Sequence, residues 1–255
     1  MQQTAQEFQL KGLFVVTGGT RGIGRSIATQ FSRAGAHVIA NFLRNEATAS
    51  SLASVAQRKG LSLEILRADV TTPDGLSRIE ARVKELNLPL RGVVHCAATG
   101  VHRTIDKMSG RHLEWTFALN VRALFDLVLR LLPQFERHAS ILAISSLGAS
   151  RAVPYYTAVG ASKGALEALI KHFAAELAPR GIRANVLTPG AVATEAWKDI
   201  PDADARLAEA AARSPIGRLV TVEELALCAQ FLCSPAASGI NGQTLVVDGG
   251  GAMLA

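Results

Sequence analysis

The stretch Leu13–Gly24 has the sequence LFVVTGGTRGIG, an aliphatic run followed at once by a glycine-rich turn. The run predicts a short buried strand over Leu13–Thr17, and the residues after the turn predict an amphipathic helix over Gly24–Ala34. Glycines between a strand and a helix permit a tight turn and a close approach of the backbone to a pyrophosphate, and the helix N-terminus supplies N–H donors. The stretch therefore predicts a dinucleotide site.

Strand and helix alternate from this stretch to the end of the chain. Short aliphatic runs bounded by Gly, Pro, Asp or Ser predict six more strands, over His37–Asn41, Ser62–Arg67, Gly92–Cys96, Ser140–Ser145, Arg183–Leu187 and Thr244–Val247. Amphipathic stretches predict helices over Ala47–Lys59, Pro73–Leu86, Gly110–Leu132, Ala158–Ala178 and Val222–Leu232. Such alternation implies parallel strands joined by right-handed crossovers. We expect one α/β domain over residues 1–255, a doubly wound parallel sheet of the Rossmann-like kind.

One segment breaks this rhythm between Pro189-Gly190 and Thr221. It contains about thirty residues, with a polar, alanine-rich middle over 202–213. A long insertion after the carboxyl end of a strand lies where ligands bind in such sheets. We expect a small mobile substrate lid over about residues 191–219, with one or two helices. A surface excursion without function is the alternative.

Composition limits the partners that this chain would bind. Its 255 residues carry a formal net charge of +6 with a pI near 9.6, but the basic residues are dispersed and only 5% of the residues are aromatic. That pattern argues against a nucleic-acid surface. A phosphorylated cofactor or an acidic carrier protein fits the charge at least as well, and a basic surface without a partner is the alternative.

The first residues and the cysteines favour a cytoplasmic protein. Residues 1–11 are polar, unlike a signal peptide, and no uncharged apolar run approaches the ~20 residues that cross a bilayer. Cys96, Cys228 and Cys233 are odd in number and lack the spacing of metal ligands. We therefore expect a reducing compartment, no membrane span and no metal.

The end of the second predicted strand indicates which nicotinamide cofactor would bind. In dinucleotide sheets an acidic residue at this place holds the ribose 2′-hydroxyl of NAD. Residues 40–45 contain no carboxylate before Glu46, whereas Arg21 lies in the glycine turn and Arg44 follows the strand. Two guanidinium groups would bind a 2′-phosphate, so we expect NADPH rather than NADH. Taken alone, each arginine is better explained as a solvated surface charge.

Asp69 and Val70 follow the third predicted strand. An aspartate there could accept a hydrogen bond from the adenine amino group, or it could cap the helix that begins near Pro73. The residues leave both interpretations open.

Four polar positions predict the reacting centre. They are Asn120 in the long fourth predicted helix, Ser146 after the fifth strand, and then Tyr156 and Lys163. A lysine makes the site positive and favours an oxyanion, and a tyrosine hydroxyl is both a donor and an acid. On one helix, residues seven apart share a face and lie roughly 10 Å apart along the axis. A packing tyrosine and an exposed lysine are the alternative.

Together these residues resemble the short-chain dehydrogenase/reductase family over nearly the whole chain. The likeness includes the glycine turn, Asn120, Lys163 and the stretch Val247–Gly250. Classical members place a tyrosine four residues before the lysine, where this chain has Val159. The Tyr-x6-Lys spacing of Tyr156 and Lys163 is instead similar to that of the NADPH-dependent type III enoyl-acyl-carrier-protein reductases of bacteria.

The resemblance implies a role for each site residue. Tyr156 would hydrogen-bond the thioester carbonyl oxygen, Lys163 would bind the nicotinamide ribose, and Asn120 would organise a water near the lysine. Ser146 occupies the classical position of the catalytic serine. The residues expected to line the cofactor are Gly18, Thr20, Arg21, Gly22, Ile23, Gly24, Arg44, Asp69, Val70, Ala97, Lys163 and Val192. His95 stands where the family usually has asparagine, and we interpret it as a satisfied strand residue, not a catalyst.

The sequence therefore predicts the NADPH-dependent reduction of the 2,3-double bond of trans-2-enoyl thioesters in fatty-acid or related acyl-chain biosynthesis. The substrate would be carried by acyl carrier protein or coenzyme A, and the family suggests a homotetramer built on the helices 110–132 and 158–178. The basic residues that would attract the carrier are Arg103, Lys107, Arg111 and Lys198. The first alternative is a 3-oxoacyl or other ketone reductase with Tyr155 or Tyr156 as the acid. The second is a catalytically silent NADP-binding protein.

Overall fold

Seven parallel strands form one sheet in the order β3-β2-β1-β4-β5-β6-β7. The computed structural model describes residues 7–195, 197 and 202–253. The strands are β1 Leu13–Thr17, β2 His37–Phe42, β3 Leu63–Arg67, β4 Leu90–His95, β5 Phe135–Ile144, β6 Arg183–Pro189 and β7 Thr244–Val247. The predicted Rossmann-like α/β fold is confirmed. The strand order reverses between β1 and β4, and sheets of this kind bind ligands beyond the carboxyl ends of their strands at such a point.

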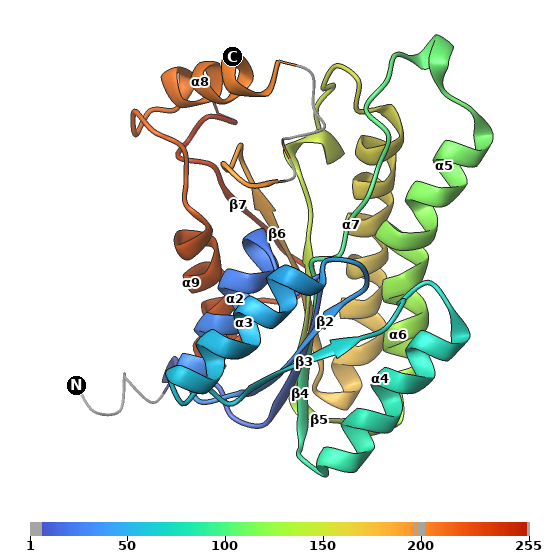
Figure 1. Cartoon of the computed structure of the whole chain (residues 1–255), viewed down its shortest axis with the longest axis vertical. Helices are drawn as coiled ribbons and strands as arrows, with labels where there is room; N and C mark the ends of the chain where they lie inside the picture. The colour runs from blue at the N-terminus through green and yellow to red at the C-terminus, as the bar shows by residue number, and fades with distance from the viewer. Residues whose placement is uncertain (1–6, 196, 198–201, 254–255) are drawn as a thin grey trace.

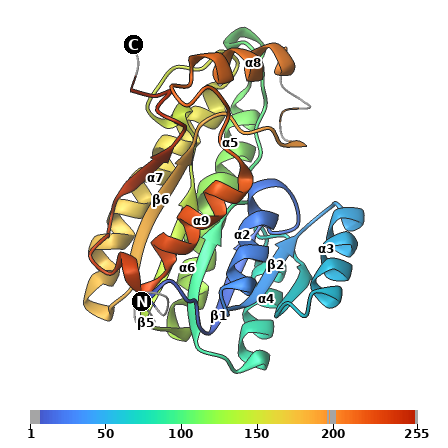
Figure 2. The same ribbon diagram turned by 90° about the vertical axis from the view of Figure 1, so that its left-hand side faces the viewer.

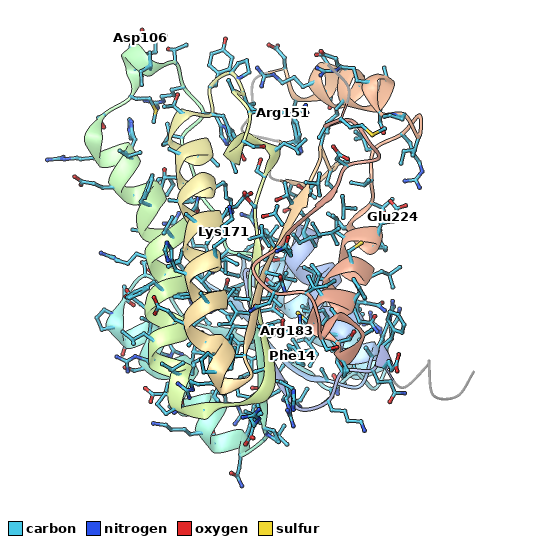
Figure 3. The ribbon with its side chains drawn as sticks, turned by 180° about the vertical axis from the view of Figure 1, so that it is seen from behind. Phe14, Asp106, Arg151, Lys171, Arg183 and Glu224 are labelled. Carbon is cyan, nitrogen blue, oxygen red and sulfur yellow. The ribbon has the colours of Figure 1, made fainter. Side chains whose placement is uncertain are left out.

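Helices cover both faces of the sheet, as Figures 1 and 2 show. One face is covered by α2 Gly22–Arg33, α3 Glu46–Arg58 and α9 Val222–Cys233, and the other by α4 Pro73–Leu86, α5 Gly110–Phe117, α6 Ala123–Leu131 and α7 Thr157–Leu177. A further helix, α8 Ala203–Arg213, lies beyond the carboxyl edge of the sheet, at the top of Figure 1. The loops that contain Asp106 and Arg151 lie at this same end of the molecule (Figure 3).

The side chains of β1 enter two apolar cores, one on each face of the sheet. Leu13 and Val15 belong to the core that includes residues of α4, α6 and α7, whereas Phe14 and Val16 belong to the core that includes residues of α2 and α9. Successive side chains of a strand point to opposite faces, which is why four of the five residues of this buried central strand are apolar. Phe14, labelled in Figure 3, packs edge-on against Phe31 with ring centroids 5.1 Å apart.

Most predicted elements agree with the observed ones to within two residues at each end, and two differ more. The helix expected over Gly110–Leu132 is helical over that range, but it is not regular throughout, because Ala118–Arg122 form a π-helical turn between α5 and α6. Strand β5 begins at Phe135, not at Ser140, since Phe135 pairs with Leu90 of β4 across an irregular register. The π-helical turn matters for the site, because it contains Asn120.

Candidate active site

The glycine turn between β1 and α2 is a backbone cradle that leaves no room for a side chain at Gly18 or Gly24. Gly18 has φ +63°, and a Cβ built on it would lie 2.9 Å from the backbone nitrogen of Ala97. A Cβ on Gly24 would lie 2.2 Å from the carbonyl oxygen of Gly18. Arg21 is the N-cap of α2 without a side-chain cap bond, and the first turn of α2 has no acidic residue. This helix end therefore suits a phosphate, so the residues present fit a dinucleotide.

The positions expected to face a 2′-phosphate carry positive charge. Arg21 and Arg44 are both exposed, beside the carboxyl ends of β1 and β2. Glu46, the next carboxylate along the chain, forms an ion pair with Arg67. Asn41 at the end of β2 is buried, and its amide donates to the carbonyl of Ala68 at 2.9 Å, which ties β2 to the segment after β3. The negative charge of Glu46 is therefore already compensated.

Asp69 does not cap α4, so that interpretation of its role is wrong. The N-cap is Thr72, whose hydroxyl accepts from the backbone N–H of Gly75 at 3.1 Å. Oδ1 of Asp69 instead accepts from the N–H of Thr71 at 2.9 Å and from its hydroxyl at 2.6 Å. This local turn competes with capping and fixes the carboxylate at the carboxyl edge of the sheet. Contact with adenine remains a prediction.

Tyr156 is held beside Ser146 at that edge. It is the N-cap of α7, so it precedes the helix and does not share a face with Lys163 as a residue within it would. Its hydroxyl donates to Oγ of Ser146 at 3.3 Å. A Cβ on Gly148 would lie 2.6 Å from the tyrosine ring, and the ring of His102 lies 5.5 Å from it between centroids. Burial raises the pKa of Tyr156, against the smaller opposite effect of the Ser146 bond, so the phenol stays protonated at neutral pH.

Val159 and Tyr155, the two other positions where a catalytic tyrosine could stand, have different surroundings from Tyr156. Val159, four residues before Lys163, is 5% exposed, and a Cβ added to Gly100 would lie 2.0 Å from its Cγ2. Tyr155 is 38% exposed, and the guanidinium of Arg206 from α8 lies 5.5 Å from its ring centroid. The structure therefore brings Tyr156, but not Tyr155, to the serine.

Lys163 is a buried cation below the edge of β5. It is 5% exposed, and its Nζ donates to the carbonyl of Ile144 at 2.7 Å. Burial lowers its pKa to about 8, while Cys96 and Glu167 act in the opposite direction. The alternative of an exposed helix charge is wrong.

Asn120 ties the π-helical turn to the loop after β4 and to α7. Its amide nitrogen donates to the carbonyl of Thr99 and to Oγ of Ser162, both at 2.9 Å, and its oxygen accepts from the N–H of Thr99 at 2.9 Å. A π turn inside a helix commonly marks a functional site. Here it presents the Asn120 side chain to the loop that leads toward Gly100 and His102.

His95 is a fully buried residue of β4, as the sequence predicted. Its Nε2 donates to the carbonyl of Leu119 at 3.1 Å, because that oxygen can only accept, and Nδ1 then accepts from the hydroxyl of Thr17 at 2.9 Å. Burial, and then the charge of Lys163, lower its pKa to about 3. The ring is therefore neutral and has a partner at both nitrogens.

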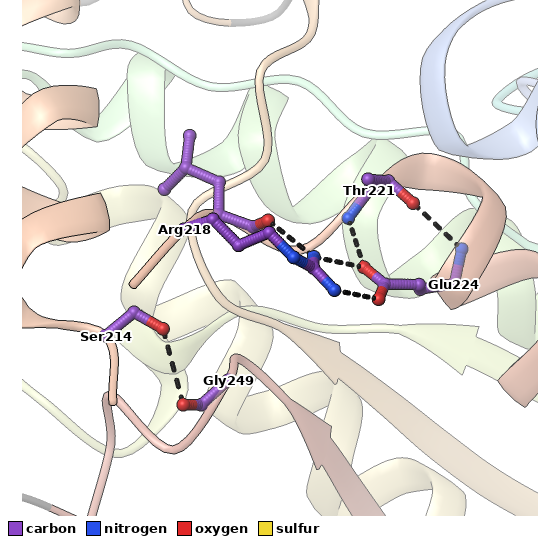
Figure 4. A network of polar contacts seen from close by, with 6 residues as sticks. Ser214, Arg218, Thr221, Glu224 and Gly249 are labelled. Carbon is purple, nitrogen blue, oxygen red and sulfur yellow. Dashed lines mark hydrogen bonds and ion pairs between the residues drawn. The ribbon is translucent and has the colours of Figure 1, made fainter. Parts of the chain in front are cut away.

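The segment 191–219 begins beside the glycine turn and ends against the last loop of the chain. Val192 is buried, and a cavity of about 550 Å³ lies between this segment and the starts of α2 and α3, lined among others by Arg21 and Trp197. Ser214 donates to the carbonyl of Gly249 at 3.3 Å (Figure 4). The middle of the segment contains one helix, α8, in the described residues.

A bidentate ion pair anchors the end of this segment to α9. Both oxygens of Glu224 accept from the guanidinium of Arg218, and one also accepts from the N–H of Thr221, the N-cap of α9 (Figure 4). The segment is thus fixed at its far end, where α9 begins.

Sequence reasoning missed contacts made by two residues outside the long helices and strands and by one residue of α7. His102 and Gly148 border the Tyr156 ring, and Glu167 accepts hydrogen bonds from Ser145 and Thr188. Loop residues follow no periodic pattern, so the sequence gives no sign of the His102 contact. For Gly148, the only signal is that a glycine follows closely after Ser145 and Ser146. The remaining predicted cofactor residues Thr20, Gly22, Ile23, Val70 and Ala97 lie on the glycine turn or on the strand ends beside it.

This geometry defines a Rossmann-like α/β protein with a serine, a tyrosine and a lysine at the carboxyl edge of its sheet. The family model described as enoyl-(acyl carrier protein) reductase matches residues 18–252. The chain therefore belongs to the short-chain dehydrogenase/reductase family of oxidoreductases.

Similar proteins in this family have different named activities. The chain is 30% identical to 1-cyclohexenylcarbonyl-CoA reductase of Streptomyces collinus over 256 residues, which cover 100% of the chain and 90% of that protein. It is 32% identical to 7alpha-hydroxysteroid dehydrogenase of Escherichia coli K12 over 242 residues, 93% of the chain and 92% of that protein. A crystal structure of gluconate 5-dehydrogenase from Burkholderia cenocepacia J2315 in complex with NADP and tartrate superposes with a TM-score of 0.89 at 28% identity, over 99% of the chain and 100% of that protein.

None of the helices within the described ranges is both long and apolar enough to cross a membrane.

Proposed function

We propose that this protein reduces the 2,3-double bond of trans-2-enoyl thioesters with NADPH. The observation that carries the proposal is the placement of the phenol: Tyr156 meets Ser146, and the classical tyrosine position holds the buried Val159. The name of the Streptomyces collinus relative denotes a thioester whose ring alkene adjoins the carbonyl, which is the same kind of conjugated acyl group. The NADP in the gluconate 5-dehydrogenase structure supports the choice of cofactor class.

The residues then have distinct tasks. When bound, NADPH supplies the hydride that adds to the β-carbon of the substrate. Negative charge develops on the thioester oxygen, and the protonated hydroxyl of Tyr156 donates a hydrogen bond to it while the Lys163 cation stabilises the same charge. The α-carbon is then protonated from water. Lys163 would also hold the ribose hydroxyls of the bound cofactor, and Asn120 would fix the loop beside the substrate through its bonds to Thr99.

The test compares substrates under one set of conditions. NADPH oxidation is followed with crotonyl and longer enoyl thioesters and, in parallel, with acetoacetyl thioesters. Turnover of the enoyl thioesters supports the proposal. Turnover of acetoacetyl thioesters alone would instead identify a ketone reductase, for which the bond between Tyr156 and Ser146 also provides a donor pair. Tight NADPH binding without any turnover would identify a catalytically silent NADP-binding protein.

Replacing Arg44 by alanine is expected to reduce the preference for NADPH. A charge-assisted bond to the 2′-phosphate at an exposed site contributes about 1–2 kcal/mol, so the ratio of kcat/KM with NADPH to that with NADH should fall roughly tenfold. Arg58→Ala, an exposed arginine at the far end of α3, is the matched control. An unchanged ratio in Arg44→Ala would remove Arg44 from the cofactor site.

Basic residues near the candidate active site would attract the carrier of the substrate, and the segment 191–219 would cover its acyl chain. Arg103, Lys107 and Arg111 are exposed on the loop before α5 and at its start, where an acidic carrier or coenzyme A would approach, while Lys198 lies outside the described residues. We propose that residues 191–219 close over the acyl chain and that the whole chain acts as one reductase domain in the cytoplasm.

We also propose a homotetramer that forms through α5, α6 and α7. Trp115, Phe125 and Leu129 are 47%, 44% and 58% exposed on the first two of these helices, and Phe125 stacks on Phe173 of α7. Large apolar side chains on one surface are typical of subunit contacts. Light scattering should give four copies for the wild type and a smaller assembly for Leu129→Glu. A monomeric wild type would contradict this assembly.

A further inference from the structure

Glu167 joins the ends of two strands beside the candidate active site. It lies on α7, one turn after Lys163, and its Oε1 accepts from the hydroxyl of Ser145 at 2.6 Å and from that of Thr188 at 3.3 Å. Ser145 is 4% exposed and Thr188 is 3% exposed. Buried hydroxyls need partners, so this carboxylate satisfies two groups that the fold would otherwise leave unpaired. It thereby fixes the residue directly before Ser146, the partner of Tyr156.

Among the titratable groups near Lys163 in the described residues, Glu167 is the one that supplies a negative charge. His95 of β4 is neutral, because its pKa is lowered to about 3. Cys96, in the loop after β4, is a neutral thiol, because burial raises its pKa to about 11. Tyr156, at the start of α7, is neutral as well. Cys96 and Glu167 are the two groups that oppose the effect of burial on the pKa of Lys163. Because the thiol is uncharged at neutral pH, the attraction there comes from the Glu167 carboxylate, one helical turn away.

We infer that Glu167 is a positioning residue of the proposed reductase, whose carboxylate holds the Ser145–Ser146 corner beside Tyr156 and places a negative charge one helical turn from Lys163. The inference rests on the proposed function, because it assigns Glu167 a task at the same centre. Glu167 reaches the reacting atoms through Ser145 and Lys163.

The first experiment measures Lys163 without any substrate. The side chains of ¹⁵N-lysine-labelled protein are titrated by NMR, with the Lys163 signal assigned through Lys163→Met. Glu167→Gln keeps the size and the acceptor oxygen but removes the charge, so the titration midpoint of Lys163 should fall by about one pH unit. Glu176→Gln, an exposed position on the same helix, should leave it unchanged. An identical midpoint in wild type and Glu167→Gln would overturn the inference.

The second experiment follows catalysis. In Glu167→Gln the alkaline limb of kcat/KM for the enoyl thioester should move to lower pH by the same amount, so the activity is near that of wild type well below the limb and about tenfold lower above it. Glu167→Ala, which also removes the acceptor, should lower kcat at every pH. Equal loss at all pH values in Glu167→Gln would reduce the residue to a structural role. A wild type that turns over no enoyl thioester would refute the proposed function, while the NMR titration would still decide the role of Glu167.

Discussion

Tyr156→Phe is expected to lower kcat for enoyl thioesters by about 10²–10³-fold, the usual effect of removing one donor to a developing oxyanion. The phenylalanine ring keeps the contact with Gly148 and loses only the hydroxyl that donates to Ser146. Because the thioester oxygen carries little charge before hydride transfer, KM should change much less than kcat. Steady-state kinetics of NADPH oxidation with crotonyl thioester measures both.

Tyr155→Phe is the matched control for this experiment. Tyr155 is the neighbouring tyrosine, it is exposed, and its ring contacts Arg206 of α8 rather than Ser146. Removal of the Tyr155 hydroxyl should leave kcat within about twofold of the wild-type value. Wild-type turnover in Tyr156→Phe, or a large loss in Tyr155→Phe alone, would refute the proposed mechanism.

Lys163→Met is expected to lower kcat/KM by at least about 10³-fold, since it removes both the positive field at the oxyanion and the donor to the ribose. Methionine retains an apolar stem of similar length, and removing a buried cation removes its desolvation cost, so the fold should persist. The carbonyl of Ile144 loses its donor, which costs about 1–3 kcal/mol. Kinetics and a fluorescence titration with NADPH separate the loss of turnover from the loss of cofactor binding.

The wild-type pH profile follows from the same group. The active cationic form of Lys163 is present at low pH and is lost as pH rises through its pKa of about 8, so kcat/KM should decline above that pH. For the Lys163→Met variant, the matched control is Lys171→Met, because Lys171 lies on the exposed side of α7 (Figure 3). Equal NADPH affinity and turnover in Lys163→Met and Lys171→Met would exclude the proposed role.

The local sequence pattern was sufficient to predict an element where its residues are compatible with only one kind of structure. The run Leu13–Thr17 is a strand with the predicted bounds, because only a strand buried on both faces needs five successive apolar or β-branched side chains. The helix Pro73–Leu86 was also predicted to the residue, but its cap was not. Asp69 and Thr72 can both cap a helix, and the choice depended on which one the backbone turn already used.

The amino-acid sequence by itself determined the order of strands and helices, the glycine cradle and the spacing of Tyr156 from Lys163, since these depend on residues close together in the chain. Only the tertiary structure decided that Asn120 lies in a π turn, because its bonds to Thr99 and Ser162 join three separate elements. It likewise decided that Glu167 contacts Ser145 and Thr188. Such contacts form when parallel strands bring distant segments to one edge, and no local pattern records which hydroxyl a buried carboxylate will meet.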